Sequence, residues 1–294
     1  DVMRQSATDA YGGLISALKQ QGYVEGKDLR LLPYDWRMSP DAAMASLSAL
    51  VDRTLAETGA AKVVLIGHSM GGLIARDYIV HGGSAKVKAM IGLATPWLGS
   101  PMAYKALAYG WDLGLKVPGT NWPAVPFDEI KLLVQNYASV YALAPDRAFF
   151  DLYGGFLIRG GKMLSFGDSL TQALAPHNRT LARQYDGWGD QLLDGSDHGV
   201  MQFLMAGRGM TTLGGYTERT DWLGMTEKTE WNVDGDGVVP RHSADLGNSR
   251  SPALAARYLG HLAGVAYANA DHTLFTQSPA VQQAVVGWLA QVNR

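Results

Sequence analysis

The stretch KVVLIGHSMGGLIARDYIV, residues 62–80, decides the fold class. It opens with an apolar, largely β-branched run of strand length and continues, after a glycine-containing turn, as a segment that reads as a helix. A strand that leads through a short turn into a helix is the beginning of a parallel α/β unit. Ser69, at the centre of the turn, is then either a nucleophile or an ordinary turn residue.

The turn itself favours a nucleophile. Ser69 is the centre of a Gly-x-Ser-x-Gly motif, and the strand before it and the helix after it are the context that a nucleophile elbow requires. Such a turn strains the serine backbone and exposes Oγ, while Gly67 and Gly71 would prevent clashes between strand and helix. The N-terminus of the helix also favours developing negative charge.

The segments around the elbow alternate between helix and strand patterns. Apolar spacing predicts amphipathic helices over residues 7–23 and 39–59, the second begun by a Ser-Pro cap and ended by a glycine. A second apolar run predicts a strand at 87–94, and residues 27–37 read as a short strand that ends at Pro33. This alternation predicts a mostly parallel sheet flanked by crossover helices.

The pattern changes in the middle third of the chain. From about residue 100 to 210 it dissolves into Trp, Pro, Gly and short apolar pieces, and residues 115–126 read as an irregular loop. We expect residues 101–210 to form an inserted cap or lid, and residues 1–100 and 211–294 to form the core. Regular patterns then return as a strand, a strand entry and a terminal amphipathic helix, at 210–217, 255–267 and 278–292.

Composition excludes several classes of protein. No uncharged apolar run reaches about 18 residues, so no transmembrane segment is predicted. The absence of cysteine excludes disulfides, thiolate metal sites and a cysteine nucleophile. With 25 basic and 27 acidic residues, scattered along the chain, nucleic acid is not expected as a partner. The 8 Trp and 13 Tyr suit bulky apolar ligands as well as core packing.

A serine nucleophile needs an imidazole to take its proton and a carboxylate to orient the imidazole. In a fold with this elbow the chain order is Ser, acid, His. Asp236 stands on a glycine-rich turn in WNVDGDGVVP, beyond the strand predicted at 210–217, and His272 follows the last predicted strand. Ser69, Asp236 and His272 are therefore the candidate catalytic residues, and this chemistry needs neither a metal nor another cofactor.

Other residues compete for the roles of base and acid. Asp234 is so close to Asp236 that position alone does not separate them, although we prefer Asp236. A calcium loop that begins at Asn232 would need a glutamate twelve positions along, where Ser243 stands, so that reading fails. The remaining histidines that we weighed adjoin the serine, follow the acid turn or fall inside the last strand pattern, namely His68, His242 and His261.

A second serine motif occurs at residues 165–170, SFGDSL. It resembles the Gly-Asp-Ser-Leu hydrolases and would make Ser169 the nucleophile. That family carries the motif on its first strand and ends with Asp-x-x-His, whereas here it lies mid-chain and Asn269 stands three residues before His272. We therefore reject this reading.

Five motifs in order resemble the lecithin:cholesterol acyltransferase family: YDWR at 34–37, the elbow, TPWLGSP at 95–101, GDGVVP at 235–240, and the late His272. The resemblance implies an α/β-hydrolase fold with Ser69, Asp236 and His272 as the triad and the amide of Met70 as one oxyanion donor. It also implies a substrate-binding region with Asp35, Trp36 and Trp97. From the residues alone, YDW could equally be a strand end with an aromatic core anchor.

The chain departs from this family in two ways. Animal members hold a lid loop with a cysteine bridge, and this chain has no cysteine. The strand and loop that usually supply the second oxyanion donor are not found in this sequence, so we expect them to precede Asp1, with the YDW turn as the internal alternative. No leader of basic, apolar and small residues stands before Asp1, so a signal peptide is expected to be absent or removed.

The leading functional interpretation is a serine hydrolase or acyltransferase that cleaves acyl esters, as a lipase or phospholipase does, through an acyl-enzyme. The alternatives are a carboxylesterase or polyester hydrolase with an open cleft, and a lipid-binding module with an inactive elbow. The expected partners are an acyl ester or lipid substrate and, peripherally, lipid surfaces. A secreted or periplasmic location is favoured.

Overall fold

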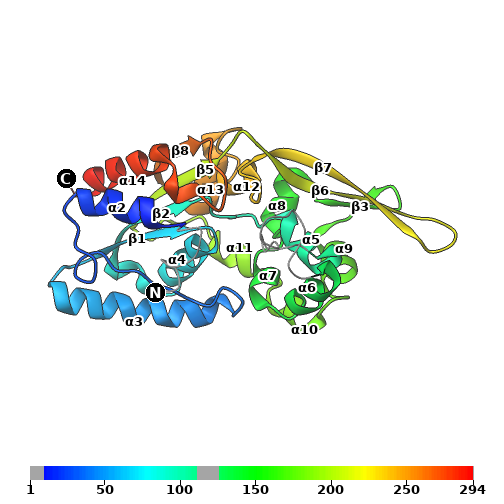
Figure 1. Cartoon of the computed structure of the whole chain (residues 1–294), viewed down its shortest axis with the longest axis horizontal. Coiled ribbons are helices and arrows are strands. Elements are labelled where there is room, and N and C mark those ends of the chain that lie inside the picture. The colour runs from blue at the N-terminus through cyan, green and yellow to red at the C-terminus, as the bar shows by residue number, and fades with distance from the viewer. Residues whose placement is uncertain (1–9, 111–125, 294) are drawn as a thin grey trace.

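The computed structural model describes residues 10–110 and 126–293 (Figure 1). Its central sheet has four parallel strands in the order β1-β2-β5-β8. They are β1 (Val63–His68), β2 (Val87–Leu93), β5 (Met201–Gly207) and β8 (Leu262–Ala268). The chain therefore has the α/β fold with a parallel sheet that its sequence predicts.

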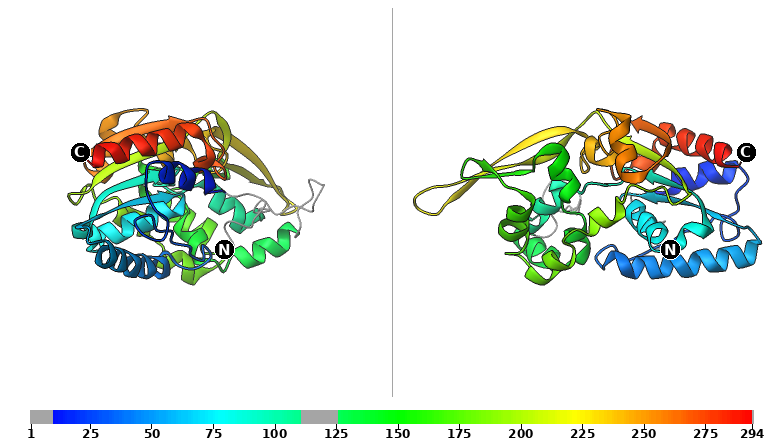
Figure 2. Two further views of the ribbon diagram at one scale, coloured as in Figure 1. Left: turned by 60° about the vertical axis from the view of Figure 1, so that its left-hand side comes forward. Right: turned by 180° about the vertical axis from the view of Figure 1, so that it is seen from behind.

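Helices cover both faces of this sheet (Figures 1 and 2). Helices α2 (Gly12–Gln20) and α14 (Pro279–Val292) share one apolar cluster with Ile91 of β2. Helices α3 (Pro40–Thr58) and α4 (Met70–Val80) share a second cluster with Met90, the preceding residue of the same strand. Successive side chains of a strand point to opposite faces, so β2 is buried on both sides.

The ends of α3 follow from its sequence. Ser39 precedes the helix in an extended conformation, and Pro40 takes the first helical position, where its missing N–H costs nothing. Gly59 ends the helix with φ of 69°, a left-handed conformation that glycine adopts without strain. The predicted helices over 39–59 and 278–292 and the strands at 63–66 and 87–94 are confirmed.

The strand predicted within residues 27–37 is wrong. Among the described residues this segment makes only an isolated bridge, between Glu25 and Leu29. An extended segment becomes a strand only when a neighbour pairs with its backbone. In the described part of the chain, β1 pairs with β2 alone, and no strand lies between β1 and this segment.

A group of short helices follows the first half of the sheet and lies to one side of it (Figure 1). Their apolar residues continue the cluster that contains α3 and α4. Residues 111–125, most of the loop predicted at 115–126, lie outside the described residues. The helices are α5 (Pro101–Tyr109), α6 (Phe127–Val134), α7 (Ala138–Ala142), α8 (Arg147–Tyr153), α9 (Phe166–Ser169), the π-turn η2 (Leu170–Leu174), α10 (Arg179–Gln184) and α11 (Trp188–Leu192).

A second sheet, in the order β4-β3-β6-β7, accompanies these helices. It contains β3 (Leu157–Arg159), β4 (Lys162–Met163), β6 (Met210–Thr220) and β7 (Thr226–Gly235). The strand predicted at 210–217 is thus β6, which belongs to this sheet rather than to the central one. The central position is taken by β5, whose apolar run is buried on both faces and which the sequence reading overlooked.

The chain returns to the central sheet after β7. The short helix α12 (Arg241–Ala244) and helix α13 (Pro252–Leu259) lead into β8, and the 3-10 turn η3 (Phe275–Gln277) leads into α14. A further 3-10 turn, η1 (Gly83–Lys86), connects α4 to β2. None of the helices that the structure describes has the length and apolarity needed to cross a bilayer.

Candidate active site

Ser69 occupies a strained turn between β1 and α4. Its φ of 55° and ψ of −129° are unusual for a residue with a side chain. The turn is held to the sheet by its backbone N–H, which donates to the carbonyl of Leu93 at the end of β2 over 2.8 Å. The strain and its support are what a nucleophile elbow requires.

The glycines around Ser69 differ in their importance. A Cβ on Gly67 would come within 2.5 Å of the backbone of Gly71, and one on Gly72 within 2.0 Å of Thr95 Oγ1. A Cβ on Gly71 would meet only the hydroxyl of Tyr34, at 3.8 Å. The close packing that the motif predicts therefore falls on Gly67 and Gly72, one residue beyond the expected position.

His272 lies between Ser69 and Asp236. Its Nδ1 is 2.9 Å from Asp236 Oδ2, and its Nε2 is 2.9 Å from Ser69 Oγ. A carboxylate accepts, so Nδ1 carries the proton and Nε2 is left as the acceptor for the serine hydroxyl. Three residues that are far apart in the sequence thus form one chain of hydrogen bonds with the polarity needed to activate a serine.

Asp236 is fixed by the turn on which it stands. Its side chain is fully buried, and Oδ1 accepts from the backbone N–H groups of Val238 (3.0 Å) and Val239 (2.7 Å). Its backbone carbonyl accepts from the N–H of His272 over 2.9 Å. Gly207, at the end of β5, makes room for it, because a Cβ there would lie 2.4 Å from Asp236 Cβ.

Asp234 faces elsewhere. Its carboxylate accepts from the backbone N–H of Gly209 and pairs with Arg241 at 2.7 Å. These contacts tie the start of β6 to the end of β7 and to α12. Of the two neighbouring carboxylates, only Asp236 is hydrogen-bonded to His272 in the described structure.

His68 supports the backbone of His272, a contact that sequence reasoning missed. Its Nε2 lies 3.0 Å from the carbonyl oxygen of His272, so Nε2 must donate. Its Nδ1 is then the acceptor for the hydroxyl of Tyr11, at 3.3 Å. Burial and the neighbouring His272 lower the pKa of His68 to about 3, which keeps the ring neutral and preserves this pattern.

Comparison with known proteins places the chain in a family. The family described as lecithin:cholesterol acyltransferase matches residues 3–150, about half of the chain. This chain belongs to that family. Mouse phosphatidylcholine-sterol acyltransferase is 33% identical over 111 residues, which cover 35% of this chain and 25% of that protein. Human lysosomal phospholipase A and acyltransferase is 26% identical over 185 residues, covering 54% of this chain and 45% of that protein.

The chain spans only a quarter to a half of the length of these curated relatives. Among solved structures, the crystal structure of the Tle4–Tli4 complex is similar with a TM-score of 0.62. The match has 15% sequence identity and covers 87% of this chain and 67% of that chain. It supports the assignment of the α/β-hydrolase fold and carries no information on substrate.

The substrate-binding candidates lie in different surroundings. Asp35 and Trp36 stand on the exposed turn before α3, where Arg37 pairs with Asp35 at 2.6 Å and lowers the pKa of that carboxyl to about 2. The indole of Trp36 packs edge-on against Tyr137, with ring centroids 5.6 Å apart. Trp97 is 1% exposed and part of the core cluster, so in this structure its indole serves packing.

The rejected candidates have structural surroundings. Ser169 is buried, and its Oγ has no hydrogen-bond partner in the described part of the chain. His242 stacks on Tyr153 with centroids 4.1 Å apart, and burial lowers its pKa to about 4. His261 is exposed between α13 and β8. None of the three has a printed contact with the group around Ser69, as expected from the motif order of the family.

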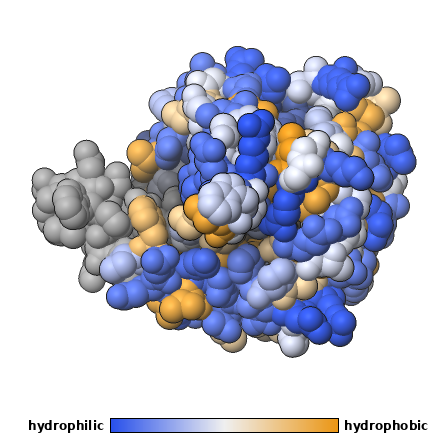
Figure 3. Space-filling model, turned by 90° about the vertical axis from the view of Figure 1, so that its right-hand side faces the viewer, coloured by the Kyte–Doolittle hydropathy of each residue, from blue (hydrophilic) through white to orange (hydrophobic). Residues whose placement is uncertain are grey.

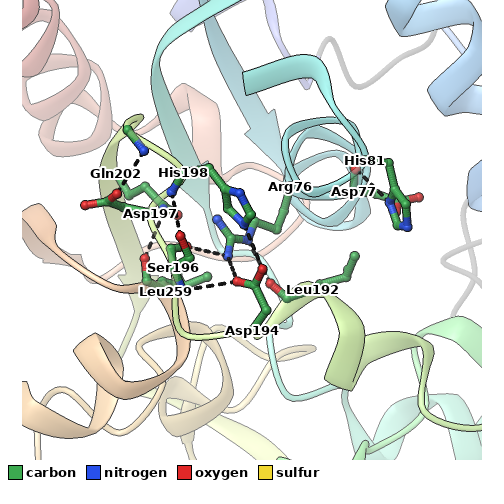
Figure 4. Close-up of polar contacts among 11 residues, drawn as sticks. Arg76, Asp77, His81, Leu192, Asp194, Ser196, Asp197, His198, Gln202 and Leu259 are labelled. Carbon is green, nitrogen blue, oxygen red and sulfur yellow. Dashed lines mark hydrogen bonds and ion pairs between the residues drawn. The ribbon is translucent and has the colours of Figure 1, made fainter. Parts of the chain in front are cut away.

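A buried ion pair holds the elbow helix in place (Figure 4). Arg76 of α4 is fully buried and pairs with Asp194 at 2.8 Å, and it also donates to the carbonyls of Leu192 and Ser196. His198 binds the other oxygen of Asp194 over 2.7 Å. These contacts join α4 to the loop ahead of β5, so removal of either charge would leave a buried ion without its partner.

Proposed function

We propose that this member of the lecithin:cholesterol acyltransferase family is a serine esterase that cleaves acyl esters, lipid esters among them, through a covalent acyl-enzyme. The observation that carries the proposal is the hydrogen-bonded chain Ser69–His272–Asp236, with 2.9 Å at both links. The Ser69 conformation and the orientation of the His272 ring support it, because both are costly or unneeded in a turn that only joins a strand to a helix.

In the proposed reaction Ser69 Oγ attacks the ester carbonyl carbon while its proton passes to His272 Nε2. Asp236 stabilises the imidazolium that forms. Met70 begins α4, where the first N–H groups have no partner within the helix, so its amide is placed to donate to the oxyanion. His272 then protonates the leaving alkoxide oxygen, and the acyl group stays on Ser69.

The second half of the reaction decides between hydrolysis and transfer. Water or an alcohol attacks the acyl-enzyme, His272 takes the proton of the acceptor, and Ser69 recovers that proton when the acyl–oxygen bond breaks. Water gives a free acid, and an alcohol gives a new ester. The same residues serve both outcomes, so the choice rests on which acceptor reaches the site.

We also propose that the expected insertion over residues 101–210, apart from β5, acts as a cap that selects the acyl chain. Its helices share an apolar cluster with α3 and α4, so the cap and the elbow side of the sheet are one packed body. Trp36 reaches this region through its contact with Tyr137, which supports its assignment, with Asp35 and Trp97, to the substrate-binding region. The dead-module alternative has no observation in its favour.

The test is turnover by Ser69→Ala on a panel of short-chain ester, triacylglycerol and phosphatidylcholine, each with and without a sterol or simple alcohol acceptor. Loss of a triad serine costs on the order of 10⁶ in turnover. Ser169→Ala is the matched control and should keep full activity with a comparable melting temperature. Activity in Ser69→Ala with an inactive, folded Ser169→Ala would overturn the proposal.

A further inference from the structure

An apolar tip ends the β6–β7 hairpin. Trp222 is 90% exposed, and the nearby Leu223 and Met225 are 64% and 69% exposed. Strand β3 pairs with β6 only as far as Glu218, so residues 219–227 continue as a two-stranded ribbon beyond the second sheet. The ribbon projects from one end of the molecule (yellow in Figure 1). Three large apolar side chains are thus displayed where no described residue covers them.

The base of the ribbon is held firmly. Glu218 is 3% exposed and accepts from the hydroxyls of Tyr104 and Tyr109 and from Arg159. The ammonium of Lys228, opposite Glu218 on β7, lies 3.7 Å from the ring centroid of Tyr109. Because these contacts fix both strands at the base, presenting the tip to a partner costs little ordering of the chain.

The backbone of the tip is largely satisfied within the turn. The carboxylate of Asp221 accepts from the N–H groups of Leu223 and Met225, each over 2.9 Å. The N–H of Asp221 donates to the carbonyl of Met225, and the N–H of Gly224 to that of Asp221. A turn whose polar groups are already paired can enter a less polar environment at a low cost of desolvation.

Shape and charge indicate what covers the tip. A stable protein interface buries about 1,200–2,000 Å², whereas three side chains at the end of a narrow ribbon offer on the order of a few hundred Å². Two basic and two acidic residues, Arg219, Lys228, Asp221 and Glu227, balance each other along the ribbon. An uncharged overall tip with an amphipathic tryptophan suits the headgroup region of a zwitterionic lipid surface.

We propose that Trp222, Leu223 and Met225 anchor the protein to a zwitterionic lipid surface, with the ribbon entering the headgroup region. This inference rests on the proposed function in one respect, because an enzyme of lipid esters gains from residence where those esters lie. Figure 3 looks onto the end of the molecule that carries the ribbon and shows small apolar patches set among hydrophilic surface. Such a surface favours shallow attachment by the tip over broad burial of this end.

The experiment measures binding of the 294-residue chain to phosphatidylcholine vesicles by flotation, which requires no turnover. The variant Trp222→Ser/Leu223→Ser/Met225→Ser should lower the partition coefficient at least about tenfold. Trp222→Phe should keep it within a few-fold, because an aromatic side chain remains. Val24→Ser/Leu31→Ser is the matched control, since it removes exposed apolar residues from the loop after α2.

Two further readings separate this proposal from others. Raising the salt concentration should leave binding nearly unchanged, because the ribbon has no net charge. Turnover of a short-chain ester in solution should be equal in the wild type and the triple serine variant, and its absence in both would count against the proposed function alone. Equal vesicle binding by the two proteins would overturn the anchor, as would a wild type that does not bind or that self-associates through the tip.

Discussion

His68 donates a hydrogen bond from Nε2 to the backbone carbonyl of His272 over 3.0 Å. On the other side of the same residue, the backbone N–H of His272 donates to the carbonyl of Asp236 over 2.9 Å. The residue before the candidate nucleophile therefore positions the residue that serves as its base. His68 also packs against this base, with ring centroids 4.9 Å apart.

His68→Phe tests this positioning role. The ring packing against Phe275 is kept while the donor to His272 is lost. We expect kcat to fall between about 10-fold and 10²-fold, as for a catalytic group displaced by a fraction of an ångström, with a smaller change in KM. Steady-state kinetics on a soluble short-chain ester give both constants. His261→Asn, at an exposed site, should leave them unchanged, and an unaltered kcat in His68→Phe would refute the role.

The lowered pKa of His68 also predicts a pH dependence of stability. The ring has a pKa of about 3 in the folded chain and about 6.5 when unfolded, so the unfolded state binds more protons between these values. The free energy of unfolding should therefore fall as the pH falls from about 6.5 towards 3. Urea unfolding at several pH values should show a shallower fall for His68→Phe than for the wild type. Parallel curves would contradict the assignment.

Asp236 and Asp234 differ in their contacts, and their amide variants should differ in activity. Asp236→Asn should lower turnover by about 10⁴, because His272 loses the acceptor that fixes its tautomer. Asp234→Asn should have a much smaller effect, since its partners are Gly209 and Arg241. Kinetics with the same ester decide the matter, and the opposite ranking would move the acid to Asp234.

Asp146 offers a prediction on stability that does not depend on function. It caps α8 by accepting from the N–H of Phe149, and burial raises its pKa to about 8. Because the folded state holds this proton above the unfolded pKa, stability is lost as the pH rises from about 4 to 8. Asn is an equally good cap and carries no charge. Asp146→Asn should raise the free energy of unfolding at pH 8 by at least about 1 kcal/mol.

Urea unfolding at pH 5 and pH 8 measures this gain, which should be smaller at the lower pH. Asp186→Asn, an exposed carboxylate on the turn after α10, is the control and should change neither value. A loss of stability at pH 8 in Asp146→Asn would show that the buried carboxyl is needed in its present form.

Local signals predicted the parts of the fold whose stability is local. The cap and glycine at the ends of α3 and the apolar runs of β1 and β2 act over a few residues, and these elements were found where expected. Residues 27–33 have strand composition, but a strand depends on a partner that composition does not reveal. The path of β6 into a second sheet is likewise decided by its pairing with β3 and β7.

The candidate site shows the same division. The motif order brought out Ser69, Asp236 and His272, because each follows a strand whose end lies at one edge of the sheet. His68 was noticed only as a neighbour of the serine, since its bond to His272 joins residues 204 positions apart. The close packing at Gly72 was missed because it depends on Thr95, which reaches α4 from the loop after β2.

The central claim is that Ser69 is a nucleophile activated by His272. The most direct test is reaction of the intact chain with a fluorophosphonate, followed by mass spectrometry of its peptides. We predict stoichiometric labelling at Ser69, none in Ser69→Ala, and slow labelling in His272→Ala, with Ser169 unmodified throughout. A folded chain that stays unlabelled, or a label carried by Ser169 instead, would contradict the account.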